Sequence, residues 1–203
     1  MRSDGDFAIF LDRNELMSSD MSASEEALGS MTCEALGQRT APQLLIGGYG
    51  MGFTLRAALA ALPPEASVIV AEIVPEIIAW ARGPMHHLTA NSLVDPRVMI
   101  VMEDVALLID SAEDAYDAIL LDVDNGPEGL TRRLNDQLYS REGLHSAMMA
   151  LKPHGILAVW SAAPDAAFAL ELERAGFAVT EAQVNAVPGG EDLHHVIWFA
   201  RKP

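Results

Sequence analysis

Acidic residues follow three short apolar runs in this sequence, and their spacing could place them around one ligand. Glu72 ends SVIVAE, Glu103 and Asp104 follow VMIVM, and Asp122 follows YDAILL. A carboxylate after the first run can accept hydrogen bonds from both ribose hydroxyls, and one after the second can accept from an adenine amino group. Asp122 would be half-buried, which costs free energy unless the carboxylate has a partner. These residues predict a site for an adenosine-containing ligand, although acids at strand ends also cap helices.

A glycine-rich turn precedes these acids, within the stretch QLLIGGYGMGFTLRAAL at residues 43–59. Glycine accepts positive φ and leaves the backbone open to a ligand, and a helix that starts in the turn directs free N–H groups toward it. The stretch therefore predicts a strand, a tight turn and a helix that together cradle a nucleotide. Its core GYGMG departs from the dinucleotide pattern GxGxxG. Four glycines form the turn: Gly47, Gly48, Gly50 and Gly52.

Strands alternate with helices along most of the chain. This alternation predicts a three-layer α/β fold with a mostly parallel sheet, in which the carboxyl ends of the strands share one ligand-binding edge. The last two strands, joined by VPGGED, should form an antiparallel hairpin at the sheet edge. Strands are expected near residues 43–46, 67–73, 95–102, 116–122, 156–162, 177–180 and 195–200. Helices are expected near residues 53–62, 75–82, 105–110, 140–151 and 164–175.

The chain divides into residues 1–40, a short N-terminal extension, and residues 41–203, the nucleoside-binding domain. In the extension, FAIFL at residues 7–11 predicts a strand, followed by a polar loop through Ser22. A helix is expected from Ser24, because two acidic residues then fall in its first turn, where the helix dipole favours them.

Composition limits the class of protein. With 203 residues, 50% of them hydrophobic, the chain is long enough for one well-cored domain. The formal net charge of −16 disfavours nucleic acid and would attract cations such as polyamines, although it also serves solubility. No apolar run approaches the roughly 20 residues that span a bilayer, and the N-terminus lacks the form of a signal peptide. The single cysteine, Cys33, cannot form an internal disulfide, which fits a reducing cytoplasm. Together these features predict a cytoplasmic protein that does not bind membranes.

The order of several motifs resembles the spermidine synthase family of class I S-adenosylmethionine-fold transferases. The resemblance covers about residues 43–160 and extends weakly to IFLD at residues 9–12. It implies a Rossmann-like class I methyltransferase fold with a seven-stranded sheet and helices on both faces. The motifs are LLIGGYGMG, VAEI, DPRVMIVMEDV, YDAILLDVDNGPEGL, QLYS and LKPHGILAVW.

The resemblance also implies a cofactor and roles for residues. The cofactor is S-adenosylmethionine or its decarboxylated form, which leaves S-adenosylhomocysteine or 5'-methylthioadenosine as product. The glycine turn would bind the adenosine, with Glu72 and Ile73 at the ribose and Asp104 and Val105 at the adenine. Asp122 would border the cofactor and accept the proton of the attacking amine.

Departures from the family pattern concern both ends of the site. Gly50 stands where the family has an aspartate that contacts the aminopropyl end of decarboxylated S-adenosylmethionine. Asn125 stands where a second aspartate holds the far amine of putrescine, and this loses a charge-assisted hydrogen bond of about 1.5–3 kcal/mol. Asp124 could substitute as an anchor or as the base, and Tyr139 could orient the substrate or pack in the core. The family's N-terminal β-domain is reduced to the extension.

The resemblance thus implies an in-line displacement at a carbon next to a sulfonium, with a small amine or polyamine as acceptor. Because Gly50 removes an acid that repels a carboxylate-bearing tail, we expect methyl transfer slightly more than aminopropyl transfer to a diamine. A non-catalytic nucleoside-binding module is the rival from another class. A homodimer is expected.

We expect no metal, although the aspartate loop also resembles that of cation-dependent O-methyltransferases. Those enzymes need an Asp-Asn pair after the next strand, where this chain offers only Asp165. The adjacent pairs His86-His87 and His194-His195 would diverge in a strand, so neither is a good chelate.

Overall fold

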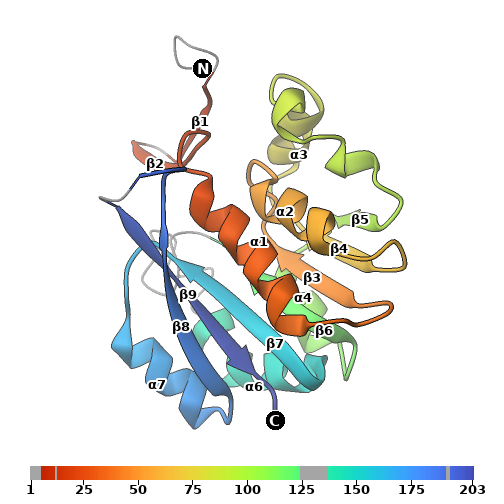
Figure 1. The fold of residues 1–203 in the computed structure, drawn as a ribbon, viewed down its shortest axis with the longest axis vertical. Helices are drawn as coiled ribbons and strands as arrows, with labels where there is room; N and C mark the ends of the chain where they lie inside the picture. The colour runs from red at the N-terminus through yellow and green to blue at the C-terminus, as the bar shows by residue number, and fades with distance from the viewer. Residues whose placement is uncertain (1–5, 12, 124–136, 191–192) are drawn as a thin grey trace.

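A seven-stranded sheet forms the centre of the molecule (Figure 1). The computed structural model describes residues 6–11, 13–123, 137–190 and 193–203. The strand order is β5-β4-β3-β6-β7-β9-β8; β3 to β7 pair in parallel, and β9 is antiparallel to β7 and β8. This confirms the predicted mostly parallel sheet with its antiparallel C-terminal hairpin. The strands are β3 (Gln43–Gly47), β4 (Ser67–Ala71), β5 (Val98–Val101), β6 (Tyr116–Leu121), β7 (Leu151–Ser161), β8 (Ala178–Asn185) and β9 (His194–Arg201).

Helices cover both faces of the sheet, so the fold has three layers. Side chains alternate along the strands: Leu44 and Ile46 of β3 pack in the core on the α1 side, and Leu45 packs in the core on the other side. Because both faces are covered, the central strands are apolar at nearly every position. On one face lie α1 (Ala23–Leu36), α2 (Phe53–Ala61) and α3 (Pro75–Arg82), and on the other lie α4 (Val105–Asp110), α6 (Arg141–Ala150) and α7 (Ala166–Arg174).

No helix in the described ranges is long and apolar enough to cross a membrane. Between α3 and β5 the chain forms two short 3-10 helices, His86–Leu88 and Ser92–Val94.

The order of the strands reverses between β3 and β6. From β3 the chain moves outward through β4 to β5, and it then crosses back to β6 on the other side of β3. The connections that leave β3 and β6 therefore run to opposite faces and open a crevice at the carboxyl ends of these strands. The glycine turn follows β3 and Asp122 follows β6, so both lie at this crevice.

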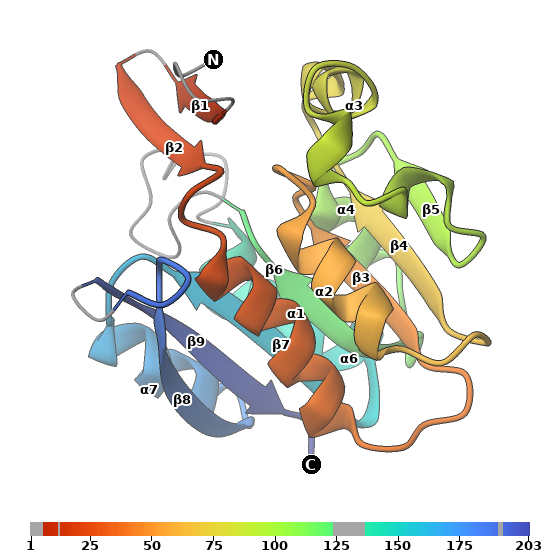
Figure 2. The same ribbon diagram turned by 45° about the horizontal axis from the view of Figure 1, so that its top comes forward.

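The N-terminal segment differs from the prediction, because part of the expected polar loop is a strand. β1 (Ala8–Leu11) pairs antiparallel with β2 (Asn14–Ser18), and Figure 2 shows this hairpin at the end of the molecule where α1 begins. The hairpin has apolar partners beyond itself, since Phe7 packs with Met51, Phe53 and Met85 in a small separate cluster. These contacts with distant residues stabilise a strand that the local sequence does not indicate.

β7 also begins earlier than expected. The strand was expected near residues 156–162, but β7 starts at Leu151 and runs through Pro153 and Gly155, beside β6. The ladder absorbs the irregularity, because its register shifts between Tyr116 and Ala118 and His154 adopts a φ of 62°. Conversely, β4 and β5 end before the acids that follow them, at Ala71 and Val101.

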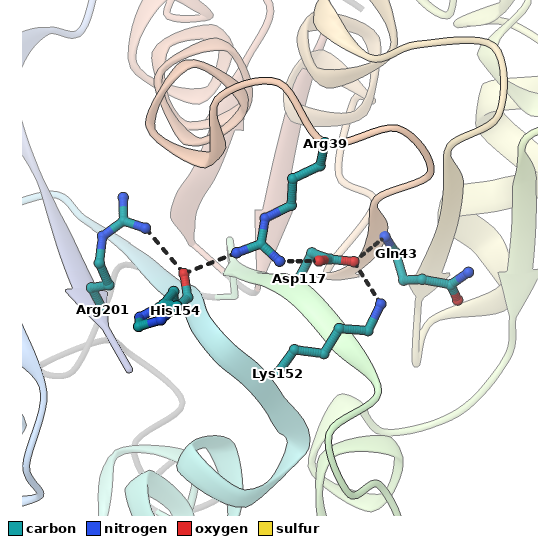
Figure 3. A network of polar contacts seen from close by, with 6 residues as sticks. All are labelled: Arg39, Gln43, Asp117, Lys152, His154 and Arg201. Carbon is teal, nitrogen blue, oxygen red and sulfur yellow. Dashed lines mark hydrogen bonds and ion pairs between the residues drawn. The ribbon is translucent and has the colours of Figure 1, made fainter. Parts of the chain in front are cut away.

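The amino ends of the central strands are joined by a polar network around Asp117 (Figure 3). This buried carboxylate of β6 accepts hydrogen bonds from Lys152 Nζ at 2.8 Å, from the backbone N–H of Gln43 at 2.8 Å and from Arg39. Burial by itself would raise the pKa of Asp117, but these hydrogen bonds outweigh burial and hold the pKa below its ordinary value. The network ties β3, β6 and β7 together at the sheet edge opposite the glycine turn.

Candidate functional site

The glycine turn brings the ends of β4 and β6 together. Gly48 N donates to the carbonyl of Ala71 at 2.9 Å, and Asp122 N donates to the carbonyl of Gly47 at 3.0 Å. Gly48 has a φ of 87°, and a Cβ added to it would lie 2.3 Å from the carbonyl oxygen of Asp122. A side chain at position 48 would therefore push the turn away from β6, so this glycine is required by both conformation and space.

Glu72 holds the turn from the end of β4. The residue is buried, Oε2 accepts from Tyr49 N at 2.9 Å, and Oε1 accepts from Val74 N at 2.8 Å. Each carboxylate oxygen can accept a second hydrogen bond, so the group can support the turn and still bind a hydroxyl. Its predicted contact with ribose stays a prediction.

Asp104 lies at the end of β5 and caps α4. Its Oδ1 accepts from Ala106 N at 2.9 Å, which is the capping role that we weighed against a role in binding. Val105 is buried against the glycine turn, where a Cβ on Gly47 would come within 3.0 Å of its Cγ2. Ile73, in contrast, is 64% exposed beside Glu72. The cap therefore explains Asp104 without a ligand, and the predicted adenine contacts of these residues stay predictions.

Asp122 meets the first turn of α2. Thr54 Oγ1 lies 2.8 Å from Asp122 Oδ2 and donates its hydrogen there. Burial raises the pKa of Asp122 to about 6, although the hydrogen bond from Thr54 opposes the rise. A carboxyl with a pKa this close to neutrality is a better proton acceptor than an ordinary aspartate.

A second carboxyl, that of Glu25, lies near Asp122. Glu25 is buried in the first turn of α1, and its Oε2 accepts from Ser24 Oγ at 2.9 Å. Burial, and then the charge of Asp122, raise the pKa of Glu25 to about 8. Ser24 Oγ also lies 2.8 Å from His195 Nδ1.

Sequence reasoning missed Glu25. The acidic first turn SEE was a visible signal, but we explained it by the helix dipole alone.

Met17 of β2 covers the middle of the glycine turn. A Cβ on Gly50 would lie 2.6 Å from Met17 Cε and 2.9 Å from its Sδ. Gly50 has a φ of 54°, which also disfavours a side chain. The N-terminal hairpin thus occupies the space where the aspartate of the resembled family would begin.

Other predicted residues are placed less directly. The ring of Tyr139 packs edge-on against Phe168 at 5.5 Å between centroids, as expected for the core-packing alternative. Asp124 and Asn125 lie outside the described residues. Asp165 caps α7 by accepting from the N–H groups of Ala167 and Phe168.

His194 and His195 diverge as expected for a strand, since His195 is buried and His194 is exposed, whereas His86 and His87 lie in a 3-10 helix and not in the strand that was expected.

A hollow of about 390 Å³ lies away from this crevice, between the last turns of α1 and strands β7 to β9. Its lining includes Met31, Ile156, Phe199 and Arg201 and none of the acids described above. We place the candidate site at the crevice, because the carboxylates and the glycine turn converge there and not at the hollow.

Comparison with known protein families identifies the family of this chain. A family profile for the spermine/spermidine synthase domain matches residues 23–174. The chain belongs to this family. The match includes the glycine turn, Glu72, Asp122 and Glu25.

Curated relatives of this spermine/spermidine synthase domain are identical to it at about three tenths of the aligned positions. Polyamine aminopropyltransferase 1 of Streptomyces coelicolor is 31% identical over 150 residues, which cover 70% of this chain and 27% of the relative. Polyamine aminopropyltransferase of Mycobacterium tuberculosis is 29% identical over 160 residues, which cover 74% and 30%. Putrescine N-methyltransferase 4 of Nicotiana tabacum is 33% identical over 115 residues, which cover 56% and 28%. The chain thus spans about three tenths of the length of these relatives.

Solved structures show the same fold. Spermidine synthase from Thermotoga maritima has a TM-score of 0.76 and 22% identity, and the match covers 97% of this chain and 65% of that one. A precorrin-6y C5,15-methyltransferase from Geobacter metallireducens has a TM-score of 0.60 and 17% identity, with 85% and 86% covered. The class I methyltransferase fold is therefore confirmed.

Proposed function

We propose that this chain transfers an alkyl group from an adenosyl sulfonium to a primary amine of a small, polyamine-type molecule. The observation that carries the proposal is Asp122, a carboxylate with a pKa raised to about 6 at the carboxyl end of β6. It lies beside a glycine turn that Glu72 holds in place. This combination supplies a base next to a cradle for a nucleoside.

The cofactor would lie along the crevice. The glycine turn and Glu72 would hold the ribose, and the exposed Ile73 offers an apolar surface for the adenine. The second oxygen of Asp104 would accept from the adenine amino group, because Oδ1 already caps α4. The sulfonium would then face Asp122.

The reaction is an in-line displacement. The nitrogen of the amine forms a bond to the carbon next to sulfur, while the bond between that carbon and sulfur breaks and a neutral thioether leaves. Asp122 takes the proton that the nitrogen loses. The protein contributes approach geometry and a base, which are the two requirements of this chemistry.

Aminopropyl transfer from decarboxylated S-adenosylmethionine is the first candidate, and this reverses our slight preference for methyl transfer. Polyamine aminopropyltransferases are among the relatives, and a solved spermidine synthase with the transition-state analogue AdoDATO shares the fold. The net charge of −16 also favours a cofactor with a cationic tail and a cationic diamine.

Methyl transfer from S-adenosylmethionine is the second candidate. Gly50, covered by Met17, removes the acid that would repel the carboxylate of that cofactor. Putrescine N-methyltransferases of tobacco are also among the relatives.

Mass spectrometry of the reaction mixture distinguishes these candidates. The purified protein is incubated with each cofactor and with a panel of diamines. Spermidine from putrescine and the decarboxylated cofactor supports the first candidate, and N-methylputrescine from S-adenosylmethionine supports the second.

Asp122→Asn should lower turnover by about 10²-fold or more while 5'-methylthioadenosine still binds in calorimetry. Absence of transfer with every pair would instead favour a non-catalytic nucleoside-binding module.

We also propose a homodimer, which light scattering would test.

A further inference from the structure

Thr54 has two hydrogen-bond acceptors within reach but only one hydroxyl hydrogen. Its Oγ1 lies 2.8 Å from Asp122 Oδ2 and 3.2 Å from the backbone carbonyl oxygen of Glu25. The shorter contact is to the carboxylate, which is also the stronger acceptor when it is charged. Thr54 is buried, so water does not compete for this hydrogen. The hydroxyl therefore fixes one oxygen of Asp122.

The close approach of α1 and α2 brings Glu25 to the same place. Gly29 of α1 lies against α2, where a Cβ on it would be 2.4 Å from the carbonyl oxygen of Thr54. Figure 2 shows the two helices side by side on one face of the sheet. Because this glycine lets the backbones touch, the first turns of both helices meet above the end of β6. Thr54 Oγ1 lies between the two residues, 3.2 Å from the backbone carbonyl of Glu25 and 2.8 Å from Asp122 Oδ2, and the charge of Asp122 raises the pKa of Glu25.

Nearby cations are engaged elsewhere. Arg56 of α2 donates to Glu26 at 2.6 Å and to the carbonyl of Leu88 at 2.8 Å. Among the described residues, no ion pair joins Glu25 or Asp122 to a lysine or arginine. In the described part of the chain, the carboxyls of Glu25 and Asp122 thus lack a compensating positive charge.

The other titratable neighbours do not supply that charge. Burial lowers the pKa of His195, so this ring is neutral at neutral pH. The charge of Glu26, the next residue in α1, raises the pKa of Glu25 further, and Glu72, which follows β4, brings no positive charge. Two carboxyls under these conditions, Glu25 buried and Asp122 half-buried, cannot both ionise cheaply, and one retains a proton.

We propose that Thr54 and Glu25 are positioning residues for Asp122: Thr54 fixes its carboxylate, and Glu25 keeps the proton so that Asp122 alone is charged. The hydrogen bond from Thr54 favours the charged form of Asp122, and the repulsion from Asp122 favours the neutral form of Glu25. The inference rests on the proposed function only for the role of Asp122 as proton acceptor. The protonation of the pair can be tested without turnover.

The first experiment measures stability against pH for the wild-type chain, Glu25→Gln and Glu34→Gln. The folded-state pKa of Glu25 is raised from 4.5 to about 8, so its stabilising contribution is present at low pH and is lost as pH rises through 8. The amide in Glu25→Gln cannot ionise. The melting temperature of this variant should therefore rise relative to wild type by about 3 °C or more between pH 5 and 9.

Glu34→Gln is the matched control, because Glu34 is an exposed glutamate on the same helix, beyond the first turn that holds Glu25. Its curve should run parallel to that of the wild type. If the Glu25→Gln curve also runs parallel to the wild type, Glu25 does not hold the proton and the inference fails.

The second experiment compares the pH dependence of turnover in Thr54→Val and Thr54→Ser. Valine has nearly the same shape but donates no hydrogen bond, so the acidic limb of the profile should move up by about one pH unit. Serine keeps the hydroxyl and should keep the wild-type midpoint. An unmoved limb in Thr54→Val would overturn the role of Thr54. If the wild type shows no turnover, the proposed function fails while the stability curves still decide the protonation of the pair.

Discussion

Met17 fills the space that a side chain on Gly50 would need: a Cβ at position 50 would lie 2.6 Å from Met17 Cε. The contact joins the N-terminal hairpin to the glycine turn. Residue 50 is therefore constrained by a segment that lies outside the nucleoside-binding domain predicted from the sequence.

Gly50→Asp should destabilise the chain by two separable effects. The left-handed conformation costs about 1–2 kcal/mol for a residue with a Cβ, and Met17 must move. Gly189→Asp is the matched control, since Gly189 has a φ of 72° and nothing within 4 Å of the added Cβ. In chemical denaturation Gly50→Asp should lose more stability than the control, and adding Met17→Ala should recover the excess. Equal losses in the two aspartate variants would show that the contact carries no energy.

Glu72→Gln should loosen the glycine turn. A glutamine replaces one of the two acceptor oxygens with an NH2 group, which would then face either Tyr49 N or Val74 N as a second donor. We expect a loss of about 1.5–3 kcal/mol in stability and weaker binding of 5'-methylthioadenosine. Glu76→Gln, at an exposed position in α3, removes the same charge and should change neither quantity. Denaturation and calorimetry measure both, and unchanged binding in Glu72→Gln would contradict the role of Glu72.

Asp117→Asn should destabilise the opposite edge of the sheet by about 1.5–3 kcal/mol at pH 7, because a charged acceptor is lost. The pKa of Asp117 is lowered in the folded state, so its contribution is present above the unfolded value of 3.8 and is lost as pH falls through the folded pKa. The difference in stability between variant and wild type should therefore shrink below pH 4. A difference that stays constant with pH would contradict the ion-pair explanation.

Asp122→Asn should stabilise the chain, whereas Asp117→Asn destabilises it. The folded-state pKa of Asp122 is raised from 3.8 to about 6, so the stability linked to its proton is lost as pH rises through 6. The amide avoids this loss and can still accept from Thr54, so the variant should gain about 1–3 kcal/mol above pH 6. Glu65→Gln, on an exposed turn, controls for the change in net charge. A loss of stability at pH 8 would show that Asp122 is stabilised as a carboxylate.

Local signals predicted several elements of the fold well. The helices at 75–82 and 105–110 match α3 and α4, because Pro75 begins the first and Asp104 caps the second. Local sequence signals failed where contacts with residues distant in the sequence determine the structure. β2 exists because the hairpin packs on Met51 and Phe53, and β7 passes through Pro153 because β6 lies beside it. Periodicity within a short window contains no information about such partners.

The same distinction between local signals and distant contacts applies to the residues of the candidate site. Glu72, Asp104 and Asp122 were predictable, because the topology of a parallel sheet places every strand end at one edge. Glu25 and Thr54 were not, since their meeting depends on how closely α1 approaches α2 at Gly29. A pattern in one helix does not reveal which turn of another helix it will touch.

The link between Ser24 and His195 joins residues 171 positions apart. Closing a loop of this length costs entropy before the contact can form, so we expect the contact to form late in folding. The hydrogen bond between Thr54 and Asp122, the proposed base, also joins distant residues, which are 68 positions apart. Protection of the amides in the first turn of α1 against hydrogen exchange should accordingly report the cooperative opening of the whole sheet, and not the fraying of one helix.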